Sequence, residues 1–469
     1  MKSYYVNRRL VFSSFFAVSI LNGAVALASD VPSNDRSDAV TDLATLIQAA
    51  ERNNPGIRAT NHNIAAARAR LNEAWVSPFF QFDVTTSFGL APEARGTSAV
   101  TAEDSQLPVD NRWLPVFKTE VKGAIPLWTF GKLSAARQAA RAAVRGAELD
   151  RDQKKAELLF DVRRAYYALQ LALDIQQMIS EGRNKLANAV ERLDKRLESD
   201  DPEVNQSDKY RLASTLAEVD ARSSEAVRLA ESSVAALQIL TGIKLIRVPD
   251  CPLEPVDFAP ESITTYKKIG RKERPEAGML RAAIVATEAD LDANQARYFP
   301  DIALALQAST SYSSGITDQS NPFVPDPANY NSFGAALVAR WSLDFWGNAY
   351  RVERSKQNLL KINSGLDQAL DGIALEVATT HSAVMDAKRR VEAWKKGHQE
   401  TRRWFVSAAQ AEEVGVGETK ELVDAVGAYF KARYNHLQAV YDFNLAVAHL
   451  ERTIGSSLLT LDEWNQSCE

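Results

Sequence analysis

The sequence of this chain repeats itself once, at a period longer than 200 residues. The offset between the two copies stays between 213 and 222 residues, so only small insertions separate them. A period of this length exceeds the unit of a solenoid and predicts two structurally equivalent halves within one chain. The corresponding segments are 54–58 with 274–278, Pro78 with Pro300, 127–131 with 343–347, and 240–242 with 453–455.

Proline marks where long helices can lie, because it interrupts an α-helix. No proline occurs between Pro126 and Pro202, and none follows Pro327. These stretches are rich in Ala, Leu, Arg, Glu, Gln and Lys, which favour helices. We therefore expect two long helices in each half, with the second ending at a C-capping glycine, Gly242 or Gly455. The expected helices cover about 132–199, 203–241, 348–413 and 418–454.

A shorter helix is expected to open each half, at about 55–77 and 275–299. The opening and closing helices of a half are together about as long as the single long helix between them. Two shorter helices can therefore stack end to end beside one continuous helix. Much of the expected contact surface is alanine. Few large apolar side chains are therefore available to form a core along helices of this length. An assembly of helices from several chains is thus favoured over a solid monomeric core.

Alternating segments lie between the opening and the long helices, and they predict half-buried β-strands. Val121 and Leu304 fall on the apolar faces of two such segments, whereas Lys122 and Gln307 fall on the polar faces. Strands of this length can cross a bilayer when tilted. An ordinary soluble hairpin in each half is the alternative. The expected strands cover about 80–90, 116–128, 301–313 and 332–345.

The first 28 residues have the features of a secretory signal peptide. Lys2, Arg8 and Arg9 precede an apolar core at 10–25, and residues 26–28 read Ala-Leu-Ala. No later segment has the roughly 20 apolar residues of a membrane-spanning helix. A membrane form of this protein would therefore need a β-barrel. Four strands cannot close one, and an open sheet edge cannot face lipid, so strands would be shared among subunits.

The chain has only two cysteines, Cys251 and Cys468. Each follows shortly after the end of one half. An even number of cysteines in an exported protein is compatible with a disulfide, and two unpaired thiols are the alternative. The formal net charge of −5 gives no sign of nucleic-acid binding.

This combination of signal peptide, duplication, paired strands and long helices resembles the outer-membrane efflux protein family, the TolC-like channels. The resemblance covers about residues 40–457. It is carried by IPLWTFG at 125–131, WSLDFWG at 341–347 and VGVGETKELVDA at 414–425, in this order and spacing. It implies a mixed α/β membrane protein: a homotrimer with a shared 12-stranded β-barrel, four strands per chain, continued by a periplasmic α-helical barrel.

The internal repeat divides the chain into two halves, a linker and a tail. After the signal peptide, the first half-repeat is expected at 29–242 and an inter-repeat linker at 243–272. The second half-repeat is expected at 273–457 and a C-terminal tail at 458–469.

The same resemblance implies a gate at the periplasmic mouth. Glu421 and Asp424, spaced i, i+3 on one helix, match positions where such channels carry carboxylates, and Asp208 matches the equivalent site of the first half. Three copies of each would form rings that attract cations. A solvated face of a charged helix is the alternative. Gly417 stands where relatives can carry a latch arginine, so we expect no latch at that residue.

The resemblance also implies that the turns of the two long helical hairpins contact an adaptor protein. They contain the helix-breaking residues Asp200, Asp201 and Pro202 in the first half and Gly415, Val416 and Gly417 in the second half.

Residues that would carry catalysis are not recognisable in the sequence. The five histidines show no close metal-ligand spacing, and there is no P-loop and no G-x-S-x-G motif. We expect no enzyme activity, no cofactor and no metal site.

The leading hypothesis is a trimeric exit channel in the outer membrane of a Gram-negative bacterium. It would serve a tripartite efflux or type I secretion system, with a periplasmic adaptor and an inner-membrane pump as partners. The alternative is a periplasmic coiled-coil adaptor or scaffold without a membrane barrel. The sequence does not identify the exported substrate.

Overall fold

The structure is a computed structural model that describes residues 41–79, 81–93, 112–198, 206–249, 251–318, 323, 325–326, 328–414 and 419–464. The expected signal peptide, the two hairpin turns at 200–202 and 415–417, and Cys468 lie outside these residues.

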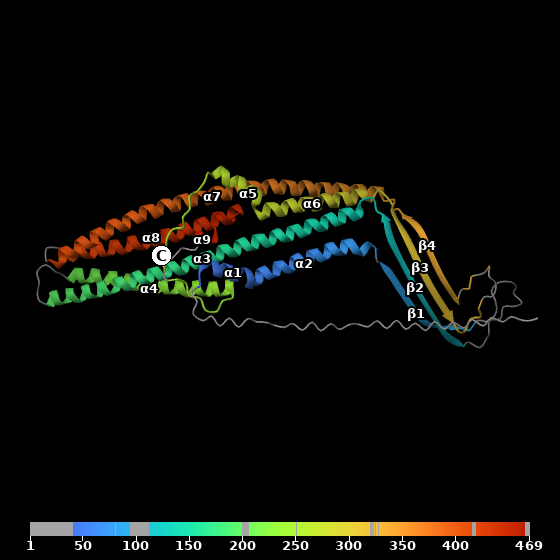
Figure 1. Ribbon diagram of the computed structural model, residues 1–469, viewed down its shortest axis with the longest axis horizontal. Coiled ribbons are helices and arrows are strands. Elements are labelled where there is room, and N and C mark those ends of the chain that lie inside the picture. Colours follow the sequence, from blue (N-terminus) through green and yellow to red (C-terminus); the bar gives the residue numbers. More distant parts are fainter. Residues whose placement is uncertain are drawn as a thin grey trace, which may run out of the picture. The chain divides into compact units, whose positions relative to one another are not determined.

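Two very long helices dominate the described chain (Figure 1). α3 (Lys132–Glu198) has 67 residues and α7 (Phe345–Glu413) has 69, each about 100 Å at 1.5 Å per residue. α3 packs along two shorter helices, α2 (Pro55–Val76) and α4 (Gln206–Thr241). α7 packs in the same way along α6 (Pro275–Ala296) and α8 (Thr419–Ile454).

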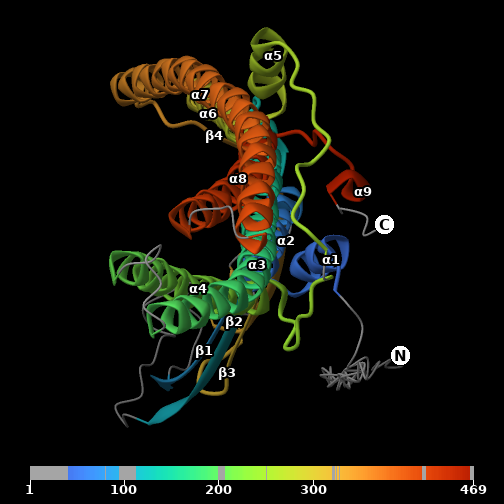
Figure 2. The ribbon, with the colours of Figure 1, turned by 90° about the vertical axis from the view of Figure 1, so that its left-hand side faces the viewer.

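The two helical sets join into one layer, because α3 also packs against α6 and α8. Neighbouring helices therefore follow the order α2–α3–α6–α7 toward the strands and α4–α3–α8–α7 toward the hairpin turns (Figure 2). α7 is an outer helix of the layer along its whole length. α2 and α4 share the opposite edge.

Each pair of short helices meets at a glycine with positive φ. Gly242 ends α4 at φ +73 and Gly455 ends α8 at φ +71, both in the left-handed region that favours glycine at a helix C-terminus. Gly242 lies against Asn53, whose side-chain amide donates to the carbonyl of Thr241 at 2.9 Å. Gly455 lies against the backbone of Arg274. The end of one helix thus abuts the approach to the next in both halves.

The four strands form one antiparallel sheet in the order β1-β2-β3-β4. They are β1 (Phe82–Pro92), β2 (Trp113–Trp128), β3 (Asp301–Ser313) and β4 (Tyr330–Arg340). The central β2–β3 pair joins the two halves of the chain. Val121 pairs with Val84 on one side and Ala308 on the other, and Leu304 pairs with Leu337. Directly paired residues share a face, so the apolar faces of all four strands lie together.

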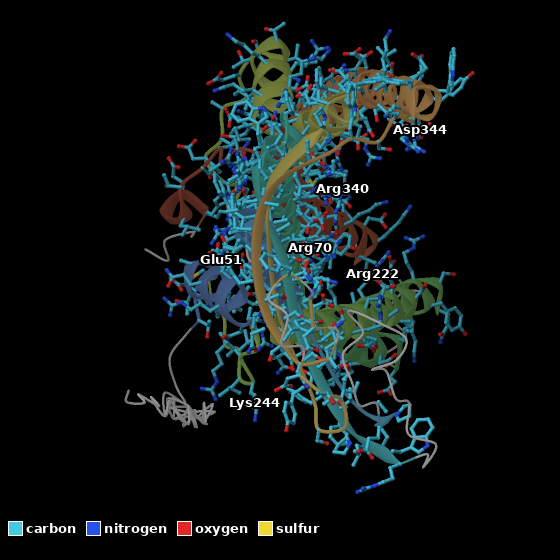
Figure 3. The ribbon with its side chains drawn as sticks, turned by 90° about the vertical axis from the view of Figure 1, so that its right-hand side faces the viewer. Glu51, Arg70, Arg222, Lys244, Arg340 and Asp344 are labelled. Atoms are coloured by element: carbon cyan, nitrogen blue, oxygen red, sulfur yellow. The ribbon has the colours of Figure 1, made fainter. Side chains whose placement is uncertain are left out.

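The last expected strand is wrong over 341–345. β4 ends at Arg340 and α7 already begins at Phe345. The reason is a helix cap: the carboxylate of Asp344 accepts a hydrogen bond from the backbone N–H of Gly347 at 3.0 Å. Arg351, one turn later, pairs with the same carboxylate at 2.9 Å. Figure 3 shows Asp344 near the start of α7.

Three helices occur where the sequence analysis placed none. α1 (Leu43–Asn53) precedes α2, α5 (Ile263–Glu273) lies mostly within the expected linker, and the short α9 (Leu461–Trp464) lies within the expected tail. Trp464 of this tail is fully buried. These short elements cover the middle of the long helices and supply part of the main hydrophobic core, together with Tyr166 and Tyr167.

No helix among the described residues is both long and apolar enough to cross a membrane.

Candidate functional site

Two of the expected gate carboxylates lie in the first turns of α8, at the hairpin end of the helical layer. Both side chains are exposed, but they turn toward different helices. Glu421 Oε1 accepts a hydrogen bond from Trp404 Nε1 of α7 at 3.4 Å. Asp424 Oδ1 lies 3.9 Å from a guanidinium nitrogen of Arg211 on α4. One carboxylate therefore faces its own hairpin partner and the other faces the first-half hairpin.

The other expected site residues are described less fully. Asp208 lies in the first turn of α4, but its side chain is outside the described set. The residues of the two hairpin turns also lie outside it. Arg211 and Trp404 were not predicted, because nothing in the sequence sets them apart from other residues of charged amphipathic helices.

A small apolar cluster lies beneath these carboxylates. Its two buried members, Val423 and Val426, are both on α8. The neighbouring side chains come from all four helices, so the cluster joins the two hairpins at this level. They are Val190, Leu216, Val219, Phe405, Leu422 and Phe430.

The two hairpins also contact each other further from their turns than the Val423–Val426 cluster. Arg433 of α8 pairs with Glu181 of α3 at 2.9 Å. The ring of Phe430 lies over the adjacent glycine of α3, Gly182, so closely that a Cβ there would meet the ring at 2.2 Å. Within the first hairpin, Lys209 pairs with Asp194 at 2.7 Å, and this hydrogen bond raises the pKa of Lys209 above its usual range.

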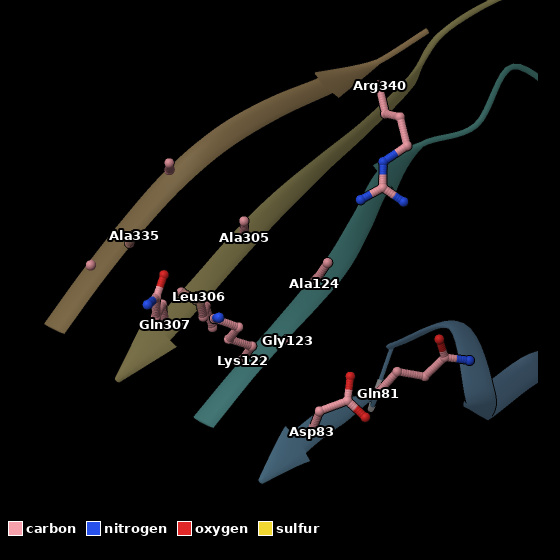
Figure 4. Close-up of a pocket in the computed structure, with 12 residues that line it drawn as sticks. Gln81, Asp83, Lys122, Gly123, Ala124, Ala305, Leu306, Gln307, Ala335 and Arg340 are labelled. Carbon is pink, nitrogen blue, oxygen red and sulfur yellow. The ribbon is translucent and has the colours of Figure 1, made fainter. Parts of the chain in front are cut away.

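The polar face of the sheet forms a second candidate site. A cavity of about 530 Å³ opens on it, lined by small residues and by five polar side chains (Figure 4). Nearby, Glu120 binds Lys122 at 2.8 Å and accepts from Gln307 at 2.9 Å. The charges of this face partly compensate one another. The five polar lining residues are Gln81, Asp83, Lys122, Gln307 and Arg340.

Cys251 takes part in a disulfide bond. Cys468, the only other cysteine of the chain, lies outside the described residues. The predicted pairing of Cys251 with Cys468 therefore stays a prediction.

Clusters of three or more His, Cys, Asp or Glu side chains able to hold a metal ion do not occur among the described residues.

Comparison with protein families gives one match that spans most of the chain. The family model described as outer membrane efflux protein matches residues 46–199 and 271–456. No curated protein matches the chain.

Several solved structures share the fold. The CusC channel is 18% identical, with a TM-score of 0.72, over 89% of this chain and 93% of its own. The open state of the MtrE outer membrane channel of Neisseria gonorrhoeae is 15% identical, with a TM-score of 0.71, over 89% of both chains. The CmeC outer membrane channel of Campylobacter jejuni is 16% identical, with a TM-score of 0.67, over 88% of this chain and 85% of its own. At 15–18% identity, these similarities show a shared fold.

Proposed function

This chain belongs to the outer membrane efflux protein family, and we propose that three copies of it form the exit channel of a tripartite efflux or type I secretion system. In this proposal the sheet lies in the outer membrane and the helices extend into the periplasm. Substrate passes through a water-filled tunnel without chemical change. The energy comes from an inner-membrane pump, reached through a periplasmic adaptor.

The observation that carries this proposal is the two-sided sheet. Its apolar face leaves large side chains open: Phe88 is 75% exposed, Phe333 78% and Leu337 70%. Water disfavours so large an apolar patch, whereas lipid accommodates it. The opposite face carries Lys122, Gln307 and the other polar side chains described above. This division supports lipid on one face and an aqueous lumen on the other.

The edges of the chain support a closed ring of several copies. β1 and β4 end the sheet of the described chain, and an unpaired edge cannot remain open in lipid. Pairing β4 of one copy with β1 of the next extends the sheet. The helical layer offers a matching pair of edges, since α7 bounds one side and α2 with α4 bounds the other. Three copies would bring together twelve strands and twelve helical positions in cross-section.

The gate is proposed at the hairpin end, where the first and second hairpins touch. Asp208, Glu421 and Asp424 would ring the narrowed mouth and favour cations there. Arg211, joined to Asp424 across the hairpins, would help to hold the closed arrangement. An exposed pair of this length contributes little stability, under about 1 kcal/mol. Such a weak contact suits a mouth that must open. The adaptor would bind at the hairpin turns.

Membrane fractionation tests the proposal directly. We expect the mature protein in the outer-membrane fraction, released only by detergent and cross-linked as a trimer. Planar-bilayer recordings of the purified trimer should then show ion conduction. Release of a monomer by salt or osmotic shock would instead support the alternative, a periplasmic adaptor or scaffold.

A further inference from the structure

Two histidines face each other inside the second hairpin, between α7 and α8. The rings of His398 and His436 stack with centroids 6.0 Å apart and planes inclined by 24°. His398 also lies 5.4 Å from the ring of Tyr429, which stacks on Phe405 at 5.6 Å. His398 and Phe405 come from α7, whereas Tyr429 and His436 come from α8. The four rings alternate between the helices and form a ladder that joins them.

The two histidines in this ladder lack hydrogen bonds at the atoms that matter for protonation. His398 Nε2 and His436 Nδ1 are buried and have no hydrogen-bond partner within the described chain. A neutral imidazole can leave an unprotonated nitrogen unpaired at modest cost. A protonated ring would instead present an N–H donor at that position with no acceptor, and a buried unpaired donor is strongly unfavourable.

Burial and cationic neighbours lower the pKa of both rings. Burial lowers the pKa of His398, and Arg433 and Arg402 lower it further. Burial also lowers the pKa of His436, with additional effects from His398 and Lys395. Both rings are therefore neutral at pH 7. Protonating both would place two like charges on stacked rings beside further cations.

Two carboxylates of α3 near the pair bind other groups. Glu181 of α3 is engaged by Arg433, and Asp174 of α3 accepts from the backbone N–H of Leu253 at 2.7 Å. A cavity of about 850 Å³ borders both histidines. Its other charged lining residues are Lys388 and Glu392 on α7, and Glu254 and Asp257 on the segment before α5.

We propose that the His398–His436 stack is a pH-sensitive joint, which holds α7 to α8 when both rings are neutral and separates them when the rings are protonated. The separation occurs where the second hairpin approaches its turn. Its consequence for gating rests on the proposed channel function, whereas the separation itself does not.

The pH window follows from the direction of the pKa shifts. An unfolded or locally opened histidine takes up a proton near its ordinary pKa of about 6.5, while the closed joint takes it up at a lower pH. The open form therefore binds more protons below about pH 6.5. The closed joint has its full stability above that pH, and it loses stability as the pH falls toward the depressed pKa values.

Hydrogen exchange on the whole detergent-solubilised protein tests the joint. We compare the wild type with His398→Phe/His436→Phe at pH 7.5 and 5.5, after correction for the intrinsic exchange rate. Phenylalanine keeps the ring stack but cannot be protonated. In the wild type we expect exchange at 395–405 and 429–437 to rise in acid by up to roughly tenfold for each histidine, because pH 5.5 lies about one unit below its ordinary pKa of about 6.5. In the double variant we expect no rise.

Two controls make the result decisive. His62 is exposed on α2, so His62→Gln should behave like the wild type. His449 is a half-buried histidine elsewhere on α8, and exchange at 445–452 reports its separate response in every variant. A wild type with no acid-induced rise at the joint overturns the proposal, even if the double variant fails to fold. An equal rise in wild type and double variant overturns it as well. Neither readout depends on conduction, so a failed joint and a failed channel are distinguishable.

Discussion

Gly455 lies directly against the backbone of Arg274, at the point where α8 ends and the chain approaches α6. A Cβ on Gly455 would meet the Arg274 Cα at 2.8 Å and its backbone N at 3.1 Å. Arg274 is itself held in place, because its guanidinium binds Glu276 and Glu376. The second-half junction of two short helices therefore depends on a residue without a side chain.

Replacing this glycine should destabilise the protein. Gly455→Ala combines a positive φ with a clash against backbone, so we expect a loss of at least about 1 kcal/mol in the free energy of unfolding. The matched control is Gly427→Ala on α8, where nothing lies within 4 Å of the new Cβ. That change should stabilise the helix by up to about 1 kcal/mol. Denaturant unfolding of both variants is the measurement. Equal stability of the two would show that the junction tolerates a side chain.

An added charge should destabilise the sheet when it lies on the apolar face and should have little effect on the polar face. Val121→Arg or Leu304→Arg places a charge toward lipid, which costs roughly 2–4 kcal/mol near the bilayer midplane. Lys122→Arg and Gln307→Arg place the same group on the polar face and should have little effect. Folding yields into lipid vesicles compare the four variants. Similar yields for all four would contradict the assigned faces.

The gate carboxylates should set ion preference. Glu421→Gln with Asp424→Asn removes up to six negative charges from the mouth of a trimer, so cation preference and block by trivalent cations should both weaken. Glu288→Gln with Asp292→Asn makes the same charge change on α6, distant in sequence from the mouth, and serves as the control. Planar-bilayer reversal potentials give the result. An unchanged preference in the first variant would assign these residues to a solvated helix face.

The ion pair of Arg163 and Glu451 should matter far more than an exposed one. Arg163 Nη1 lies 2.7 Å from Glu451 Oε1, and the two side chains are only 5% and 9% exposed, respectively. Glu451→Gln leaves the guanidinium buried without its counter-charge, and we expect a loss of about 3–5 kcal/mol in unfolding free energy. Glu225→Gln breaks the exposed pair with Arg222 and should cost under about 1 kcal/mol. Thermal unfolding of the two variants compares them, and equal shifts would contradict the argument.

The disulfide prediction has a simple chemical test. If Cys251 pairs with Cys468, the bond closes a loop of more than 200 residues and is nominally worth several kcal/mol. Mass spectrometry of non-reduced proteolytic digests should then find the two cysteine peptides joined. Recovery of both peptides separately, each alkylated without reduction, would refute the pairing.

Much of the architecture was readable from local sequence patterns. Strand faces follow from a period of two, so Val121 and Lys122 could be assigned to opposite sides before their partners were known. Long helices follow from the absence of proline and from helix-favouring composition, because both act within a few residues. The prediction that the last strand continues past Arg340 was wrong, because Asp344 caps α7 and an alternating pattern does not reveal a helix cap.

The candidate site was predictable only in part, because its geometry joins segments far apart in the chain. The i, i+3 spacing of Glu421 and Asp424 placed both on one side of α8. It could not show that one contacts Trp404 of α7 and the other approaches Arg211 of α4. Those contacts depend on how the hairpins pack.

The sequence by itself determined the duplication, the length of the helices and the two faces of the sheet, because each depends on periodicity or on residues near one another. Tertiary structure alone decided that Trp464 is buried against the middle of α3 and that His398 stacks on His436. Both arrangements require the packing of helices that are distant in sequence, and no local pattern records which of their faces meet.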